Sequence, residues 1–195
     1  MKPYYEDTKA GIVIYNGDCR EVLPELPSVD LVLTDPPYPG YEKGWEVPDV
    51  GAILNGISAA TFIVFWPVMT DPPILVDAED VWHKPNGNSA HHYERILRRG
   101  DTGAGCKVYR VAAILPDYKQ YAAECVAHPT QKPIKLLRAL LLKHPGETVL
   151  DPFMGSGTTL RAAKDLGRRC IGIEIEERYC EIAAKRLSQE VLALV

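Results

Sequence analysis

The chain has 195 residues, of which 46% are hydrophobic and 25% charged, so it fits a single globular domain with a sizeable core. The formal net charge of −4 excludes a uniformly basic nucleic-acid-binding protein but leaves room for a local basic face. The five cysteines form no CxxC pair and no Cys/His cluster at metal-ligand spacing; they are Cys19, Cys106, Cys125, Cys170 and Cys180. We therefore expect reduced thiols, no bound metal and a cytoplasmic protein.

Neither a secretory signal nor a membrane span is expected. The first eleven residues contain no apolar run of the kind that a signal peptide needs. The most apolar stretch, residues 51–69, is interrupted by Asn55, Ser58, Thr61 and Pro67. These interruptions favour a buried helix followed by a strand over a membrane span.

Short apolar runs alternate with amphipathic patterns along the chain, which is typical of an α/β fold with a mainly parallel sheet. In chain order we predict strands at residues 12–15, 29–34, 61–66, 148–150 and 170–175. Helices are predicted at residues 20–26, 50–60, 133–143, 158–166 and 177–187. Residues 98–127 have no clear period, so we predict a loop-rich insert there, with one short strand within 107–115. The whole chain, 1–195, is predicted to be one domain.

The strand predicted at residues 29–34 ends at the tetrapeptide Asp35-Pro36-Pro37-Tyr38, and open α/β sheets bind ligands at such carboxyl ends. The prolines fix their φ angles and have no N–H, so the local carbonyls are held as rigid acceptors. A carboxylate and a fixed carbonyl together accept both hydrogens of an NH2 group, and the Tyr38 ring offers a stacking face. The alternative is a strand-ending turn with a capping aspartate, which is how we interpret the second such tripeptide, at residues 71–73.

The exocyclic amine of adenine or cytosine suits such a site. Its lone pair is delocalised into the ring, which makes the nitrogen a poor nucleophile. Hydrogen bonds from both amine hydrogens to Asp35 and to the Pro36 carbonyl would favour a pyramidal nitrogen with its lone pair aimed at a methyl donor.

A second motif combines a strand end, a glycine turn and a helix start, from Asp151 to Thr159. We expect Gly155 and Gly157 to let the backbone approach a ligand closely, with the helix-start amides as donors. The next strand carries Glu174, 19 residues after Gly155, the spacing at which a carboxylate meets the ribose hydroxyls of a nucleoside. The alternatives are a packing turn for the glycines and capping of the next helix by Glu176 and Glu177, which follow Glu174.

Charge is distributed unevenly along the chain. Residues 94–143 contain ten Lys and Arg against four Asp and Glu, an excess of +6 that leaves −10 for the remainder. This asymmetry is compatible with a polyanion-facing side and also with an ordinary solvated basic face.

The motifs together resemble the beta-class DNA amino-methyltransferases of bacterial restriction-modification systems and phages, in which DPPY precedes an FxGxG motif. The resemblance rests on DPPY at 35–38, on His128-Pro129-Thr130-Gln131-Lys132-Pro133 and on residues 151–159, and it extends over residues 12–187. Segments 16–19, 82–84 and 93–94 match weaker family blocks. The resemblance implies a Rossmann-like class I methyltransferase fold, with a mainly parallel sheet, helices on both faces and a circularly permuted motif order.

The resemblance also implies S-adenosylmethionine as methyl donor, no metal, and a flipped base of double-stranded DNA as substrate. It assigns a catalytic role to Asp35, Pro36, Pro37 and Tyr38. It assigns cofactor binding to Asp18, Cys19, Asp35, Thr130, Lys132, Asp151, Phe153, Gly155, Ser156, Gly157, Thr158 and Glu174. In that set Asp18 would meet the adenine amine, Glu174 the ribose, and Thr130 and Lys132 the methionine carboxylate. The alternatives are that Asp18 caps the helix at Arg20 and that Lys132 is a solvated first-turn residue.

The sequence departs from the family in two places. Pro39-Gly40 follows DPPY where relatives often carry a small polar residue, and residues 98–127 replace a target-recognition region that is usually much longer. Sequence readout in the major groove normally needs several side chains on a rigid element. We therefore expect low sequence specificity, a short target, or contacts borrowed from the second subunit of a homodimer.

Aspartate in DPPY is typical of adenine-N6 enzymes and serine of cytosine-N4 enzymes, so adenine N6 is the expected target and cytosine N4 the alternative. An RNA amino-methyltransferase is disfavoured by the motif order, and a small-molecule methyltransferase by the basic segment. A silent DNA-binding subunit is disfavoured because Asp35 and the glycines are intact. A nicotinamide oxidoreductase would not need DPPY.

Overall fold

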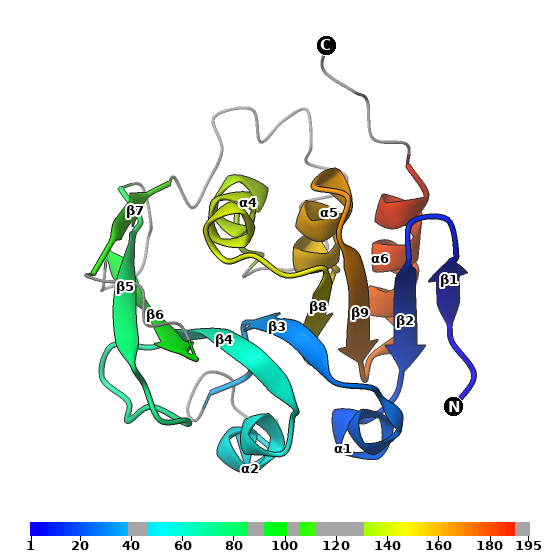
Figure 1. Cartoon of the computed structure of the whole chain (residues 1–195), viewed down its shortest axis with the longest axis horizontal. Coiled ribbons are helices and arrows are strands. Elements are labelled where there is room, and N and C mark those ends of the chain that lie inside the picture. Colours follow the sequence, from blue (N-terminus) through cyan, green and yellow to red (C-terminus); the bar gives the residue numbers. More distant parts are fainter. Residues whose placement is uncertain (39–46, 86–91, 101–105, 112–130, 190–195) are drawn as a thin grey trace.

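The computed structural model describes residues 1–38, 47–85, 92–100, 106–111 and 131–189 (Figure 1). The described strands are β1 (Tyr5–Asp7), β2 (Ile12–Asn16), β3 (Val29–Thr34), β4 (Ala59–Trp66), β5 (Ala78–His83), β6 (Tyr93–Arg99), β7 (Val108–Arg110), β8 (Thr148–Asp151) and β9 (Arg169–Glu174). The described helices are α1 (Cys19–Val22), the 3-10 turn η1 (Leu23–Glu25), α2 (Val50–Asn55), α4 (Ile134–Lys143), α5 (Thr158–Asp165) and α6 (Glu177–Ser188). The strands form one sheet in the order β1-β2-β9-β8-β3-β4-β6-β5-β7.

The centre of the sheet is parallel and its flanks are mixed. Strands β2, β9, β8, β3 and β4 run parallel to one another, while β1 pairs antiparallel with β2, and β6 pairs antiparallel with both β4 and β5. The predicted α/β class with a mainly parallel sheet is confirmed. From β3 the chain continues to β4 on one side, and from β8 to β9 on the other. The carboxyl ends of β3 and β8 therefore flank the switch point at which open sheets bind ligands.

Helices cover both faces of the sheet, α4, α5 and α6 on one and α1 and α2 on the other (Figure 1). Side chains alternate along β3, so that Leu31 and Leu33 join the core under α4 to α6, whereas Val32 joins the core under α1 and α2. A strand buried on both faces is apolar almost throughout, which is why this segment reads as a continuous apolar run.

The predicted helix at 50–60 is wrong beyond Asn55. The Gly56 amide donates back to the carbonyls of α2, and Ala59 already pairs with Val29 in the sheet. Alanine favours a helix in isolation, but here the pairing with β3 decides its conformation. The predicted helix at 20–26 is a single α-turn that tightens into the 3-10 turn η1, where Pro24 lies at the start.

The structure adds β1, β5 and β6, for which the sequence analysis predicted no strand. Strand β7 falls within the 107–115 window, and most of the remaining insert lies outside the described residues. Cys19, Cys170 and Cys180 are buried free thiols, and Cys106 is an exposed one. In the described ranges, no helix has both the length and the apolar character that crossing a membrane requires.

A buried charge cluster joins the antiparallel strands to α4. Asp80 of β5 is fully buried and contacts the Arg98 guanidinium of β6 at 3.4 Å and the Lys143 ammonium of α4 at 2.9 Å. It also accepts a hydrogen bond of 2.8 Å from the Lys107 amide. A carboxylate removed from water in this way is stable only while its partners remain in place.

We expect Asp80→Ala to lower the free energy of unfolding by about 3–5 kcal/mol, because it leaves buried cations without their carboxylate. Urea denaturation measures this. The matched control is Glu79→Ala on the same strand, where a more exposed carboxylate pairs with Arg95, and a loss below about 1 kcal/mol is expected. Equal losses in the two variants would contradict the assignment.

Candidate functional site

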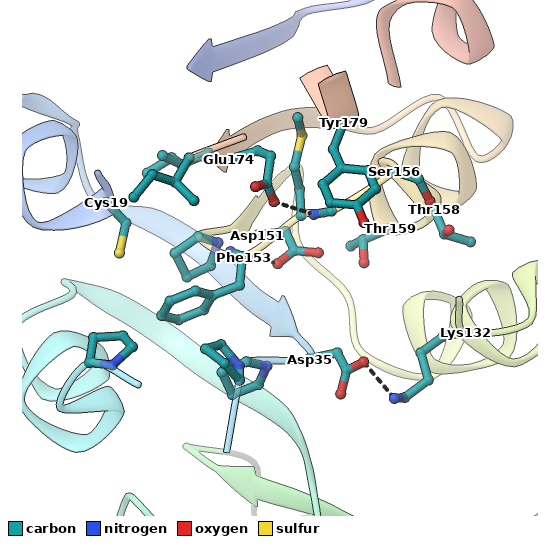
Figure 2. A pocket seen from close by; sticks show the side chains of 18 of the residues that line it. Cys19, Asp35, Lys132, Asp151, Phe153, Ser156, Thr158, Thr159, Glu174 and Tyr179 are labelled. Atoms are coloured by element: carbon teal, nitrogen blue, oxygen red, sulfur yellow. Dashed lines mark hydrogen bonds and ion pairs between the residues drawn. The ribbon is translucent and has the colours of Figure 1, made fainter. Parts of the chain in front are cut away.

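The carboxyl ends of β2, β9, β8 and β3 surround a cavity of about 350 Å³ (Figure 2). This volume lies in the range of small-molecule sites. The described residues include no group of three or more His, Cys, Asp or Glu side chains arranged to hold a metal ion.

Most of the residues that the sequence analysis assigned to the site line this cavity. They are Asp18, Cys19, Asp35, Pro36, Pro37, Tyr38, Lys132, Asp151, Phe153, Gly155, Ser156, Thr158 and Glu174. Thr130 lies outside the described residues, as do His128, Pro129 and Pro39-Gly40.

Gly157 is not among the lining residues, and the packing alternative describes it better. Its φ is +75°, and a Cβ there would lie 2.7 Å from the Cβ of Ala183 in α6. The glycine is required because α6 packs against the turn, and a role of Gly157 toward a ligand stays a prediction. Gly155, with a φ of +50°, does lie on the cavity wall.

Strands β3 and β8 are joined at their carboxyl ends by a buried hydrogen bond. The Thr34 hydroxyl donates to the Asp151 carboxylate at 2.7 Å, and the Phe153 amide donates to the same oxygen at 3.2 Å. Burial raises the pKa of Asp151 to about 6, although these hydrogen bonds act in the opposite direction. Asp151 therefore holds the start of the glycine turn next to the DPPY strand.

One carboxylate oxygen of Asp35 has a hydrogen-bond partner and the other has none. Its Oδ2 accepts a hydrogen bond from the Lys132 ammonium at 2.5 Å (Figure 2). Its Oδ1 has no hydrogen-bond partner among the described residues. Burial raises the pKa of Asp35 to about 6, and the nearby Glu94 adds to this, whereas Lys132 lowers it. Oδ1 is therefore a buried acceptor without a partner, on a residue that lines the cavity.

Lys132 is not the solvated residue of the alternative interpretation. Its side chain is only 10% exposed, and its ammonium contacts Glu94 at 3.1 Å as well as Asp35. The nitrogen also lies 5.0 Å from the centroid of the Phe65 ring, within cation–π range. Burial alone would lower the pKa of Lys132, but Asp35 and Glu94 outweigh it and raise the pKa, so the ammonium is charged.

Glu174 supports the glycine turn from the end of β9. Its carboxylate accepts a hydrogen bond from the Gly155 amide at 3.0 Å (Figure 2). It also accepts one from the Glu176 amide at 2.8 Å. Burial raises its pKa. The Glu174 carboxylate thus supports the start of α6 and also forms part of the cavity wall, whereas the N-cap residue, Glu176, makes no side-chain capping hydrogen bond.

Asp18 caps α1. Its side chain accepts a hydrogen bond from the Arg20 amide at 2.9 Å, and the same side chain pairs with the Arg20 guanidinium, which lowers the pKa of Asp18. The capping alternative is confirmed. Asp18 also lines the cavity, so a contact with a ligand stays a prediction.

One residue outside the motifs, Arg186, holds two of the motifs together. Arg186 of α6 is buried and donates to the Ser156 carbonyl at 2.9 Å, to the Thr158 hydroxyl at 3.0 Å and to the Gln131 side chain at 2.9 Å. It thereby fastens the segment before α4 to the glycine turn. Helical periodicity places Arg186 on the packed face of α6, but no sequence signal names Gln131 as its partner.

Tyr38 is backed by Trp66 of β4, with ring centroids 6.3 Å apart in an edge-on arrangement. The Trp66 indole donates to the Asp71 carbonyl at 2.8 Å. The second tripeptide, at 71–73, thus belongs to a loop that anchors Trp66.

Part of the basic excess in residues 94–143 is neutralised inside the protein. Arg95, Arg98, Lys132 and Lys143 pair with Glu79, Asp80 and Asp35, acids that lie outside the segment in sequence. The excess is therefore a weaker indication of a polyanion-binding face than its value of +6 suggests.

Comparisons with known proteins agree with the fold and the motifs. The model of the N6_N4_Mtase family, described as DNA methylase, matches residues 75–185. The Type II methyltransferase M2.DpnII of Streptococcus pneumoniae is 39% identical over 114 residues, which cover 56% of this chain and 41% of that protein. The Type II methyltransferase M.BglII of Bacillus subtilis is 27% identical over 251 residues, covering 91% of this chain and 69% of that protein.

Among solved structures, the complex of M1.HpyAVI with SAM superposes with a TM-score of 0.65 at 24% identity, covering 91% of this chain and 100% of that one. This likeness establishes the fold. The match to M2.DpnII spans about two fifths of the length of that relative.

The raised pKa of Asp151 predicts a pH dependence of stability. Because the pKa in the folded protein, about 6, lies above the usual value for aspartate, the folded state binds this proton more tightly than the unfolded state. The resulting stabilisation is complete below pH 4 and is lost as the pH rises through 6. We expect the free energy of unfolding of the wild type, relative to Asp151→Asn, to fall by about 2 kcal/mol between pH 4 and pH 7. Parallel pH profiles in urea denaturation would contradict this.

Proposed function

The chain belongs to the N6_N4_Mtase family of DNA methylases, and from this we propose that it is an S-adenosylmethionine-dependent DNA methyltransferase. Its target would be the exocyclic amine of a flipped base, with adenine N6 as the first choice. The observation that carries the proposal is the unpartnered Oδ1 of Asp35 beside the rigid Pro36-Pro37 backbone at the cavity wall.

Asp35 and the Pro36 carbonyl would together accept the two hydrogens of the amine. This arrangement favours a pyramidal nitrogen with its lone pair directed into the cavity. Tyr38, braced by Trp66, would stack on the extruded base, a contact worth about 1–3 kcal/mol in nucleic-acid complexes.

The cavity suits S-adenosylmethionine in its chemistry. Glu174 would provide a carboxylate for the ribose and Asp18 an acceptor for the adenine amine, and Phe153 and Gly155 line the same cavity. Lys132 lies on the same wall, but its ammonium already has two carboxylate partners, so a methionine carboxylate would have to share it. When bound, the cofactor would supply a methyl group on a positively charged sulfur, which departs as a neutral thioether.

The amine nitrogen forms the new N–C bond and gains positive charge as it does so. The carboxylate of Asp35 stabilises that charge electrostatically. With a pKa of about 6, it is also a suitable acceptor for the proton that the nitrogen then releases.

We propose double-stranded DNA as the substrate. The proposed location is the cytoplasm of a bacterium, whether the protein is of bacterial or of phage origin. Aspartate in DPPY supports adenine N6, and cytosine N4 is the second candidate. An RNA amine is less favoured because of the motif order. The short insert at 98–127 supports a short target, low sequence specificity or a homodimer whose second subunit adds contacts.

The direct test is transfer of labelled methyl from S-adenosylmethionine to DNA and, in parallel, to RNA, followed by nucleoside analysis. We expect N6-methyladenine in the DNA. Asp35→Ala should reduce transfer at least a thousandfold while cofactor affinity, measured by calorimetry, changes less than threefold, because the cofactor would be held chiefly elsewhere.

The control is Asp71→Ala in the second tripeptide, which keeps the backbone carbonyl that anchors Trp66 and should transfer methyl at the wild-type rate. Near-normal transfer by the Asp35 variant would overturn the mechanism. Transfer of the labelled methyl group to RNA but not to DNA would overturn the proposed substrate.

A further inference from the structure

We propose that Glu94 and Lys84 are positioning residues for Asp35: they hold the Lys132 ammonium on Oδ2 alone and so leave Oδ1 without a partner, as an acceptor for the target amine. The role of Oδ1 toward the amine rests on the proposed function. The positioning of the carboxylate does not.

Four charged side chains form an alternating chain that leads away from the cavity. The Lys132 ammonium lies 2.5 Å from Asp35 Oδ2 and 3.1 Å from Glu94 Oε1, and the Lys84 ammonium lies 3.0 Å from Glu94 Oε2. Exposure falls from 27% for the Asp35 side chain to 10% for both Lys132 and Glu94. Of these four side chains, Asp35 directly follows β3 and Lys132 precedes α4. Glu94 lies in β6, and Lys84 directly follows β5.

Glu94 controls where the Lys132 ammonium sits. An ammonium offers three hydrogens and has no preferred plane, so with Asp35 as its only anion it could settle between the two carboxylate oxygens. Glu94 pulls it to one side. Lys84 occupies the other oxygen of Glu94, which prevents that carboxylate from turning away.

The aromatic rings around the lysines fix their approach. Lys132 lies 5.0 Å from the Phe65 centroid and 5.8 Å from the Trp82 centroid, and Lys84 lies 5.0 Å from the same Trp82 ring. Both ammonium groups therefore rest against an aromatic face, which attracts them electrostatically. No residue of this arrangement other than Asp35 and Lys132 lines the cavity.

The charged groups that act on Asp35 are Lys132, Glu94, Lys84 and, from β8, Asp151. Glu94 raises the pKa of Asp35, and Lys132 lowers it. Replacing the two residues should therefore move the titration of Asp35 in opposite directions. A general loss of structure would move both variants the same way, toward the usual value for aspartate.

The test compares Glu94→Gln and Lys132→Met with Glu79→Gln, a control that breaks a pair on β5 away from the cavity. Asp35 is titrated by NMR of ¹³C-labelled aspartate, and Asp35→Asn identifies its signal. We expect the midpoint to fall in Glu94→Gln, to rise in Lys132→Met and to stay unchanged in Glu79→Gln.

In the methyl-transfer assay, Glu94→Gln should lower kcat about tenfold, with the acidic limb of its pH profile moved to lower pH and the affinity for S-adenosylmethionine changed less than twofold. A wild-type kcat and pH profile in Glu94→Gln would overturn the proposal. So would a Lys132→Met variant that binds S-adenosylmethionine at least tenfold more weakly with an unchanged Asp35 titration, because Lys132 would then serve the cofactor.

The two proposals fail separately. If the wild type transfers no methyl to DNA but the titrations move as expected, the proposed function is wrong and the positioning of Asp35 stands. If methyl transfer occurs but both titrations are unchanged, the positioning is wrong and the function stands.

Discussion

The ammonium of Lys132, buried between the carboxylates of Asp35 and Glu94, joins three parts of the molecule that are distant in sequence. One is the end of β3, one is the antiparallel strand β6, and the third is the segment that leads into α4. A buried charge is tolerated only with an opposite charge beside it, so each of these groups depends on the others. The arrangement of the cavity follows from this constraint, because Asp35 at its wall cannot turn without breaking the pair.

From the sequence we predicted the centre of the sheet and missed strands on both flanks, β1 on one and β5 and β6 on the other. Strands β3, β4, β8 and β9 are apolar because helices cover both of their faces, and that pattern is easy to recognise. Strands β5 and β6 carry Asp80, Glu94 and Arg98, residue types that normally indicate a surface. All three are buried here in ion pairs, and a pairing between distant segments leaves no periodic signal.

The sequence also predicted the outline of the candidate site, because the topology of a parallel sheet determines where strand ends lie. Residues at strand ends, such as Asp35 and Glu174, reach the cavity because parallel strands bring their carboxyl ends to one edge. Whether a glycine serves a ligand or a neighbouring helix depends on what lies opposite, and for Gly157 that is Ala183. The basic excess of residues 94–143 could likewise not be interpreted from the sequence alone. The sum counts cations whose carboxylate partners lie outside that segment.

The strand order has a consequence for the order of events during synthesis. Strand β2, near the amino terminus, pairs in parallel with β9, and β3 lies against β8. Contacts between such distant segments form slowly, and a ribosome has translated most of the chain before either partner exists. Until then β2 and β3 can pair only with β1 and β4, the backbone N–H and C=O groups on their other edges have no strand partner, and the Asp35 end of β3 cannot meet Lys132. The nascent chain would be open to chaperones and proteases for longer than a protein of this length with local contacts.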